Sequence, residues 1–119
     1  MISEPIHTGM VGGSPVRFFR PPTTDGELPW LSFVDLLVAC RLPIDLREAY
    51  FYSVWGQPGA EALKVATPNG PAVTISNTVA LAILGVVTSQ GQCRADIAEL
   101  YEKEIIAAQG AGRLGGEGA

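Results

Sequence analysis

The sequence predicts a single α+β domain, with a small antiparallel sheet and a layer of about four helices. The chain has 119 residues, which is too few for two domains with separate cores. Hydrophobic residues make up 47% of it and charged residues 17%, so it holds enough apolar material to build a core. Segments of strand character and of helical periodicity follow one another in the order β-α-α-β-β-α-α. Such an order is typical of a small sheet with helices packed on it.

Glycine is concentrated near the two ends of the chain, where eight of the 14 glycines lie. An ordered glycine costs backbone entropy and contributes no side-chain packing. We therefore expect flexible tails over residues 1–15 and 110–119, and a folded domain over residues 16–109. A strand over Ile6–Val11 would complete a hairpin with the first predicted strand, but little in the sequence supports it.

The first predicted strand covers Val16–Arg20, which is rich in β-branched and aromatic residues and is followed by two prolines. The first helix follows Ser32, a good N-cap residue, with Asp35 three positions later in a weak capping box. Residues 33–39 are apolar on most sides of this helix, so we expect it to be substantially buried. Pro43 limits the helix, because proline disfavours helical geometry in the residue before it.

A second helix is expected from Ile44 to Trp55, with Gly56 as its natural stop. Its first turn is acidic, which favours the positive end of the helix dipole. One stripe of this helix is sufficient to face a core, and it consists of Leu46, Ala49, Tyr50 and Val54. A second stripe carries Arg47 and several aromatic rings. The core of this domain is not expected to bury so much aromatic surface, so we expect these rings to contact another molecule.

A β-hairpin is the next predicted unit, with strands over Glu61–Thr67 and Ala72–Ser76. Between them, Pro68-Asn69-Gly70 offers a proline with fixed φ and a glycine that tolerates positive φ. These residue types in this order are typical of a tight turn.

Two further helices complete the predicted fold. Ser76 or Asn77 caps a nearly all-apolar helix that extends to Val87, and an amphipathic helix runs from Arg94 to about Ala108. The longest apolar run is far shorter than the roughly 20 residues that a membrane-spanning helix needs. The first residues also lack the basic and apolar regions of a secretory signal. We therefore expect a soluble, cytoplasmic protein without membrane contact.

The composition disfavours metal binding and catalysis. Metal sites need clustered imidazole or thiolate ligands, and the chain has one histidine, His7, and two cysteines far apart in sequence. Nucleophilic catalysis needs a base beside the nucleophile, and His7 lies outside the predicted domain. We therefore expect no enzyme activity, no catalytic residues, no cofactor and no metal. Cys40 and Cys93 are interpreted as buried small side chains rather than a disulfide. A small enzyme with an unrecognised pocket remains an alternative.

The charge balance and the second helix together predict a protein partner. The net charge of −4 argues against a protein that coats nucleic acid by bulk electrostatics. Aromatic and arginine side chains are enriched at the centres of protein interfaces. The predicted contacts are Trp30, Arg47, Phe51, Tyr52 and Trp55. Burial of both tryptophans in the core would count against this hypothesis.

The alternative is a sequence-specific DNA-binding regulator with an arginine-lined face, formed by Arg17, Arg20, Arg41 and Arg47. The two helices around Pro43 are compatible with a helix-turn-helix, in which the first turn of the second helix approaches the major groove. Asp45 and Glu48 occupy that turn and would repel phosphates, so groove readout by this helix is disfavoured. Self-association through the apolar helix over Val79–Val87 is also open, with a homodimer and a monomer equally expected.

Two segments resemble the Bro-type N-terminal domain of phage antirepressors. In Gly26–Leu37, a tryptophan-containing segment leads into a helix with Asp35 near its start, and Gly70–Leu81 resembles that family's later hairpin where it enters a capped helix. The resemblance covers about residues 16–106 and is mainly one of element order, with Leu42-Pro43 in place of the family's glycine after the first helix. It implies transcriptional control on a phage, plasmid or integrative element. Together with the acidic charge balance, it predicts an antirepressor or antiactivator that sequesters a protein regulator.

Overall fold

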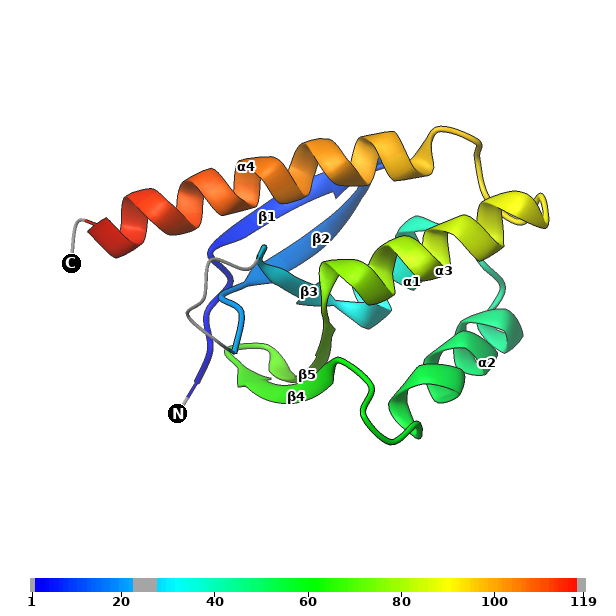
Figure 1. Ribbon diagram of the computed structural model, residues 1–119, viewed down its shortest axis with the longest axis horizontal. Helices are drawn as coiled ribbons and strands as arrows, with labels where there is room; N and C mark the ends of the chain where they lie inside the picture. Colours follow the sequence, from blue (N-terminus) through cyan, green and yellow to red (C-terminus); the bar gives the residue numbers. More distant parts are fainter. Residues whose placement is uncertain (1, 23–27, 118–119) are drawn as a thin grey trace.

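The computed structural model describes residues 2–22 and 28–117, with the side chains of 113–117 left out. The described residues form a five-stranded antiparallel sheet in the order β1-β2-β3-β5-β4, together with four helices (Figure 1). The predicted α+β class is therefore confirmed, with two more strands than expected. The strands are β1 (His7–Val11), β2 (Ser14–Phe19), β3 (Trp30–Ser32), β4 (Ala62–Thr67) and β5 (Gly70–Ile75). The helices are α1 (Phe33–Ala39), α2 (Ile44–Trp55), α3 (Asn77–Ser89) and α4 (Ile97–Glu117).

The N-terminal segment differs from the expected flexible tail, because β1 pairs along its whole length with β2. Gly12 and Gly13 are the two residues of the hairpin turn, with φ of 59° and 86°. Two consecutive positive φ angles are what a two-residue turn needs to match the twist of its strands, and glycine reaches them without strain. Gly9 serves a close approach, since a Cβ there would collide with the Glu104 carboxylate on α4. His7 also lies in this strand and bonds Glu104 at 3.0 Å.

The C-terminal end also differs from the expected tail, because α4 continues to Glu117. Its amphipathic part packs on β1, and Ala108 is fully buried. Beyond the predicted end, Gly112 lies so close to Ile6 that an added Cβ would be 3.0 Å from Ile6 Cδ1. Its carbonyl oxygen also accepts a hydrogen bond from Arg20 at 3.5 Å. Glycine has a low helix propensity, so the glycines in this part of the chain would end an isolated helix. The tertiary contacts of Gly112 therefore explain why α4 continues through them.

The junction between the sheet and α1 is held by a small polar network. Ser32 is the N-cap, and its Oγ accepts a hydrogen bond from Asp35 N at 3.3 Å, as the sequence predicts. The Asp35 carboxylate in turn accepts the backbone N–H of Arg17 at 3.0 Å and its Nε at 2.8 Å. This network fixes the start of α1 against β2 and β3.

The hairpin of β4 and β5 and the start of α3 agree with the sequence. Gly70 has φ of 105° in the turn, where it pairs with Thr67. The Ser76 side chain accepts a hydrogen bond from Val79 N at 3.3 Å and so caps α3. The helix buries Ala80, Ile83, Leu84 and Val87 on one face, and Leu81 and Val86 are exposed on the other. Among the described helices, none has both the length and the apolar character that crossing a bilayer requires.

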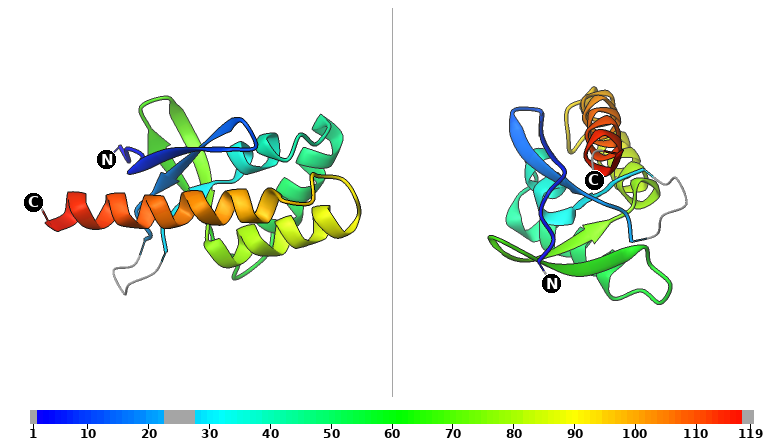
Figure 2. Two further views of the ribbon diagram at one scale, coloured as in Figure 1. Left: turned by 90° about the horizontal axis from the view of Figure 1, so that it is seen from above. Right: turned by 90° about the vertical axis from the view of Figure 1, so that its left-hand side faces the viewer.

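The core lies between the sheet and the helices α1, α3 and α4. Helix α1 contacts β2, β3 and β5, and α4 lies along β1 and beside α3 (Figure 2). Tyr101 of α4 is the largest fully buried side chain, with its ring 6.3 Å from that of Phe18 on β2. Its hydroxyl donates a hydrogen bond to Asn77 Oδ1 at 2.7 Å, which links α4 to the start of α3.

The segment before β1 connects the two sides of the sheet. Ile6 N donates to Phe18 O on β2 at 2.8 Å, and Ser3 N donates to Ala66 O on β4 at 2.7 Å. Because β1 and β4 are the two outermost strands, this segment crosses from one sheet edge to the other. The sheet is therefore curved, because one segment hydrogen-bonds near both of its outer strands.

Replacement of Tyr101 by phenylalanine tests how the core holds α4. We expect Y101F to lower the free energy of unfolding by about 1 kcal/mol at neutral pH, because one buried hydrogen bond is lost while the ring stays packed. Urea unfolding followed by circular dichroism measures this difference.

The same variant tests a dependence on pH. Burial, with a smaller contribution from the charge of Glu102, raises the pKa of Tyr101 above its ordinary value of 10.0. The unfolded chain therefore loses the phenol proton first, so this stabilisation is present below pH 10 and is lost as the pH rises through the raised value. Above pH 10 the unfolding free energy of the wild type should fall more steeply than that of Y101F. Parallel curves would contradict the assignment.

Candidate functional site

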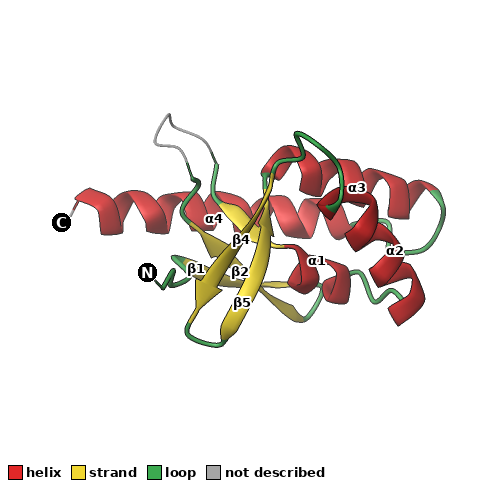
Figure 3. Ribbon diagram, turned by 90° about the horizontal axis from the view of Figure 1, so that it is seen from below, coloured by secondary structure: helices red, strands yellow, loops and turns green. Residues whose placement is uncertain are grey.

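Helix α2 is the least enclosed helix of the described chain. None of its 12 residues is buried, although half-buried side chains such as Leu46, Tyr50 and Val54 do pack against the core. Among the helices and strands, α2 makes its main contact with α1. It lies beyond α1, at the end of the molecule away from the C-terminus (Figure 3). A helix with large apolar residues and no buried face is a candidate for contact with another molecule.

Local interactions explain why α2 forms with so little burial. Pro43 precedes its first turn and accepts a hydrogen bond from Arg47 N at 3.0 Å. Asp45 lies in that first turn, where a negative charge stabilises the positive end of the helix dipole. In the middle of the helix, the Tyr50 hydroxyl is bonded to Gln92 Oε1 at 2.7 Å, which ties α2 to the loop after α3. The predicted bounds, Ile44–Trp55, are confirmed.

The aromatic residues of α2 form a cluster that extends from the core to the surface. Phe51 stacks on the buried Phe33 of α1, with ring centroids 5.5 Å apart. On its outer side the Phe51 ring meets Tyr52 edge-on at 5.2 Å and Trp55 at 6.4 Å. Tyr52 is 66% exposed and Trp55 is 38% exposed. Phe51 is therefore the support, while Tyr52 and Trp55 present ring surface outward.

A groove of about 230 Å³ lies between α1 and α2, beside this cluster. Apolar side chains from both helices form most of its wall. We call it the α1–α2 groove, and it is lined by Val34, Leu37, Ile44, Arg47, Glu48, Phe51 and Tyr52. Its rim is unusually apolar for a surface, since Val34, Ile44 and Tyr52 are all exposed.

Arg47 gives this groove a polar recognition point. Its Nε atom is buried, yet it has no hydrogen-bond partner among the described residues. A buried N–H of a charged group costs free energy unless an acceptor reaches it. A carboxylate satisfies a guanidinium best, because its two oxygens match the fork of N–H groups. Glu48, which also lines the groove, is exposed and makes no such bond within the described part of the chain.

A second hollow, of about 250 Å³, lies on the other side of Phe51. Trp55 lines it together with Lys64 of β4 and Val73 of β5. The hollowed surface beside α2 thus continues from the α1–α2 groove, past the aromatic cluster, to the β4–β5 hairpin.

Trp30 does not belong to this surface, so its predicted role as a partner contact is corrected. It lies in β3, where it pairs with Phe19 of β2, and it is only 9% exposed. A strand as short as three residues leaves little signal in the sequence, and the tryptophan was therefore assigned to a surface segment. The other four predicted contacts, Arg47, Phe51, Tyr52 and Trp55, do lie together on α2.

Comparison with protein-family models, with curated proteins and with solved structures finds no match to this chain. The resemblance to Bro-type domains therefore stays a prediction from the order of motifs. The function of this chain is therefore inferred from the geometry of its own residues.

The arginines of the DNA-binding alternative are not gathered on one face. Arg17 is paired with Asp35 and lies over the Phe19 ring, 5.9 Å from its centroid. Arg20 follows β2, whereas Arg41 donates to the carbonyl oxygen of Gly12, in the turn before β2, at 3.2 Å. The length of the strand, on the order of 20 Å, therefore separates these two cations. Arg47 lies on α2 and lines the α1–α2 groove.

Metal-binding groups do not converge in the part of the chain that the structure describes. No group of three or more histidine, cysteine or acidic side chains is close enough there to hold a metal ion. His7, expected in a tail, is instead engaged with Glu104 between β1 and α4. This pair links a strand to a helix and has a structural explanation.

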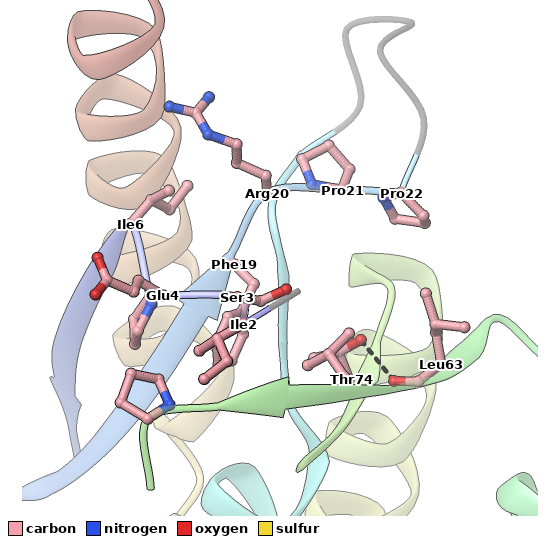
Figure 4. Close-up of a pocket in the computed structure, with 13 residues that line it drawn as sticks. Ile2, Ser3, Glu4, Ile6, Phe19, Arg20, Pro21, Pro22, Leu63 and Thr74 are labelled. Atoms are coloured by element: carbon pink, nitrogen blue, oxygen red, sulfur yellow. Dashed lines mark hydrogen bonds between the residues drawn. The ribbon is translucent and has the colours of Figure 1, made fainter. Parts of the chain in front are cut away.

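Another hollow, of about 880 Å³, lies between the N-terminal segment, the end of β2 and β4 (Figure 4). Its wall is largely aliphatic side chains and prolines. The Thr74 hydroxyl already donates to Leu63 O at 2.9 Å, and Arg20 points away from the hollow toward α4. Pro22, at its rim, borders residues that the structure does not describe. The other polar side chains that line this hollow are those of Ser3 and Glu4.

Four residues of the groove were not predicted as contacts: Val34, Leu37, Ile44 and Glu48. Val34 belongs to α1, a helix that is apolar on most sides and that the sequence predicts to be substantially buried. The structure buries four of its seven residues and leaves Val34 and Val38 exposed. The signal was present: a seven-residue helix at the edge of a small core cannot enclose an apolar residue on every side.

Alanine substitutions in the aromatic cluster separate support from contact. Phe51→Ala should lower the free energy of unfolding by about 2 kcal/mol, because its ring stacks on the buried Phe33. Tyr52→Ala should change it by less than about 0.5 kcal/mol, because the ring is mostly in solvent. Thermal and urea unfolding measure both values. An equal loss in the two variants would place Tyr52 in the core rather than on a contact surface.

Proposed function

We propose that the protein is a non-enzymatic binding domain that captures a segment of another protein in the α1–α2 groove. The partner segment has an apolar side chain next to a carboxylate. The observation that carries this proposal is α2 itself, which has large exposed apolar residues and no fully buried residue. A domain of this size gains stability from every apolar residue it encloses, so a helix left outside in this way has another use.

The lining of the groove supports the apolar half of the partner segment. Val34, Ile44 and Tyr52 surround a space large enough for one leucine-sized or aromatic side chain. Tyr52 and Trp55 flank it with rigid rings, the type of residue that contributes most to binding at the centre of an interface. Phe51 contacts these rings from the core side and holds them in place. The conformational entropy that their side chains lose on binding is therefore small.

Arg47 supports the acidic half. Its buried Nε lacks an acceptor among the described residues, and the Arg47 side chain lines the same groove. A carboxylate of the partner would satisfy this donor and form a charge-assisted hydrogen bond. Asp45 and Glu48 lie on the same helix, so the partner carboxylate must approach from the Arg47 side and avoid both of them.

The biological role we propose is that of a small transcription regulator of the antirepressor or antiactivator type. The resemblance to Bro-type domains suggests it, and binding to a protein surface is the step that such sequestration needs. The separation of Arg17, Arg20 and Arg41 favours a protein partner over DNA. The partner would then be a regulator whose working surface carries an acidic, apolar segment.

A library of random peptides displayed on phage provides the probe for the first experiment. Peptides selected on the immobilised domain should share a large apolar residue close to an aspartate or glutamate. A synthetic copy of a selected peptide should bind Tyr52→Ala and Arg47→Gln at least about tenfold more weakly than the wild type, by isothermal titration.

The matched control is Ile106→Ala, because Ile106 is 65% exposed on α4 and lies away from α2. It should leave the affinity unchanged, and the thermal unfolding of all variants should confirm that they are folded. Three results would refute the proposal: equal affinity in all variants, a wild-type dimer in light scattering that Tyr52→Ala separates, or duplex DNA bound through Arg20 and Arg41. The second would mean that another copy of the chain occupies the groove.

A further inference from the structure

Cys40 and Cys93 are far apart in the sequence but line one cavity of about 350 Å³. Cys40 is the C-cap residue of α1, and Cys93 lies in the loop between α3 and α4. Arg41, Arg94 and the turn residue Gly12 complete most of the wall. Both cysteines are free thiols in the structure. The cavity therefore brings together two oxidisable groups that the α1–α2 groove does not use.

The two cysteines line the same cavity, and they differ in access. Cys40 is 1% exposed, whereas Cys93 is half-buried. Burial raises the pKa of Cys40 to about 12, and the charge and hydrogen bonding of Cys93 add to this rise.

Turns on both sides hold the pair in place. Arg41 follows Cys40 with φ of 60°, in the left-handed region that a residue with a Cβ adopts only when its surroundings hold it there. Its backbone N–H donates to Val38 O at 2.9 Å, and its side chain donates to Gly12 O. On the other side, Gln92 N donates to Val87 O at 2.8 Å, which fixes the residue before Cys93.

We propose that Cys40 and Cys93 form a dithiol site that a low-molecular-weight disulfide, such as oxidised glutathione, converts into an intramolecular disulfide. The proposal is independent of the α1–α2 groove and of the partner segment. It assigns a chemical role to residues that the sequence analysis interpreted as small buried side chains only.

The reaction takes place in two thiol–disulfide exchanges. The accessible Cys93 sulfur attacks oxidised glutathione, so that a mixed disulfide forms on Cys93 and one glutathione leaves with the proton. The neighbouring Cys40 sulfur then attacks the Cys93 sulfur, which releases the second glutathione with the Cys40 proton. In total, two protein thiols are oxidised, one glutathione disulfide is reduced to two thiols, and the protein loses two hydrogen atoms.

The side chains around the pair favour an anionic oxidant. Arg41 and Arg94 both line the cavity, and Asp96, which bonds Arg94, is the acidic group in contact with them. Oxidised glutathione carries several carboxylates, so its approach to two guanidinium groups is favourable.

The disulfide would join the end of α1 to the α3–α4 loop and close a long stretch of chain. Such a cross-link restricts the unfolded state more than the folded one, and the gain grows with the length of the closed loop. Since Tyr50 of α2 is already bonded to Gln92, next to Cys93, the cross-link would reinforce the contact between the α1–α2 unit and the rest of the fold.

The test exposes the reduced wild type to oxidised glutathione and follows it by intact-mass spectrometry without reductant. We expect the loss of two hydrogen atoms, a cross-linked tryptic peptide pair containing Cys40 and Cys93, and a rise in Tm of roughly 10 °C that dithiothreitol reverses. An unchanged mass, a covalent dimer, or a stable glutathione adduct in the wild type would overturn the proposal.

Two single variants identify the order of the steps. Cys40→Ala keeps a small apolar group in the core and should trap one glutathione on Cys93, with no rise in Tm. Cys93→Ser changes the accessible position and should gain no glutathione, because the remaining thiol is buried. If Cys93→Ser still reacted, or if either variant gained the same thermal stability as the wild type, the proposed cross-link would be wrong.

Discussion

The ion pair between Arg17 and Asp35 determines how the helices are placed on the sheet. Asp35 accepts three hydrogen bonds from Arg17, and its own backbone N–H donates to Ser32 at the end of β3. One carboxylate therefore connects β2, β3 and α1 within a few residues of chain. Helix α2 contacts the core mainly through α1, so the position of the α1–α2 groove depends on this junction. A polar pair at the surface of the core thus sets the geometry of an apolar site.

The elements that could be predicted are those with signals inside a few neighbouring residues. Pro43 fixes the start of α2, Ser32 and Ser76 cap their helices, and Gly70 allows the tight turn before β5. The strand β1 could not be predicted in the same way. The glycines of a two-residue hairpin turn have the same composition as a flexible tail, and only pairing with β2 distinguishes them. The length of α4 likewise depends on contact with Ile6, which lies about a hundred residues away in the sequence.

The residues of the candidate site can likewise be separated into those that the local sequence predicts and those that only the fold brings together. The aromatic stripe of α2 was predictable, because a helix with two apolar stripes and one core leaves one stripe outside. Trp30 was predicted as a partner contact although it is buried, because its strand is too short to give a pattern in the sequence. Val34 became part of the groove only through the position of α1 at the edge of the core. The proximity of Cys40 and Cys93 also needs the fold, since nothing in the local sequence of either residue refers to the other.

The hydrogen bond between Ser3 and Ala66 affects how neighbouring molecules meet in solution. An outer strand with unpaired N–H and C=O groups is a template on which a second chain can add its own strand, and repetition of that step leads to aggregates. The chain covers part of the outer side of β4 with its own first residues. Removal or displacement of this segment would uncover a ladder of backbone groups without altering the buried core. The first few residues therefore contribute more to resistance against aggregation than to the free energy of unfolding.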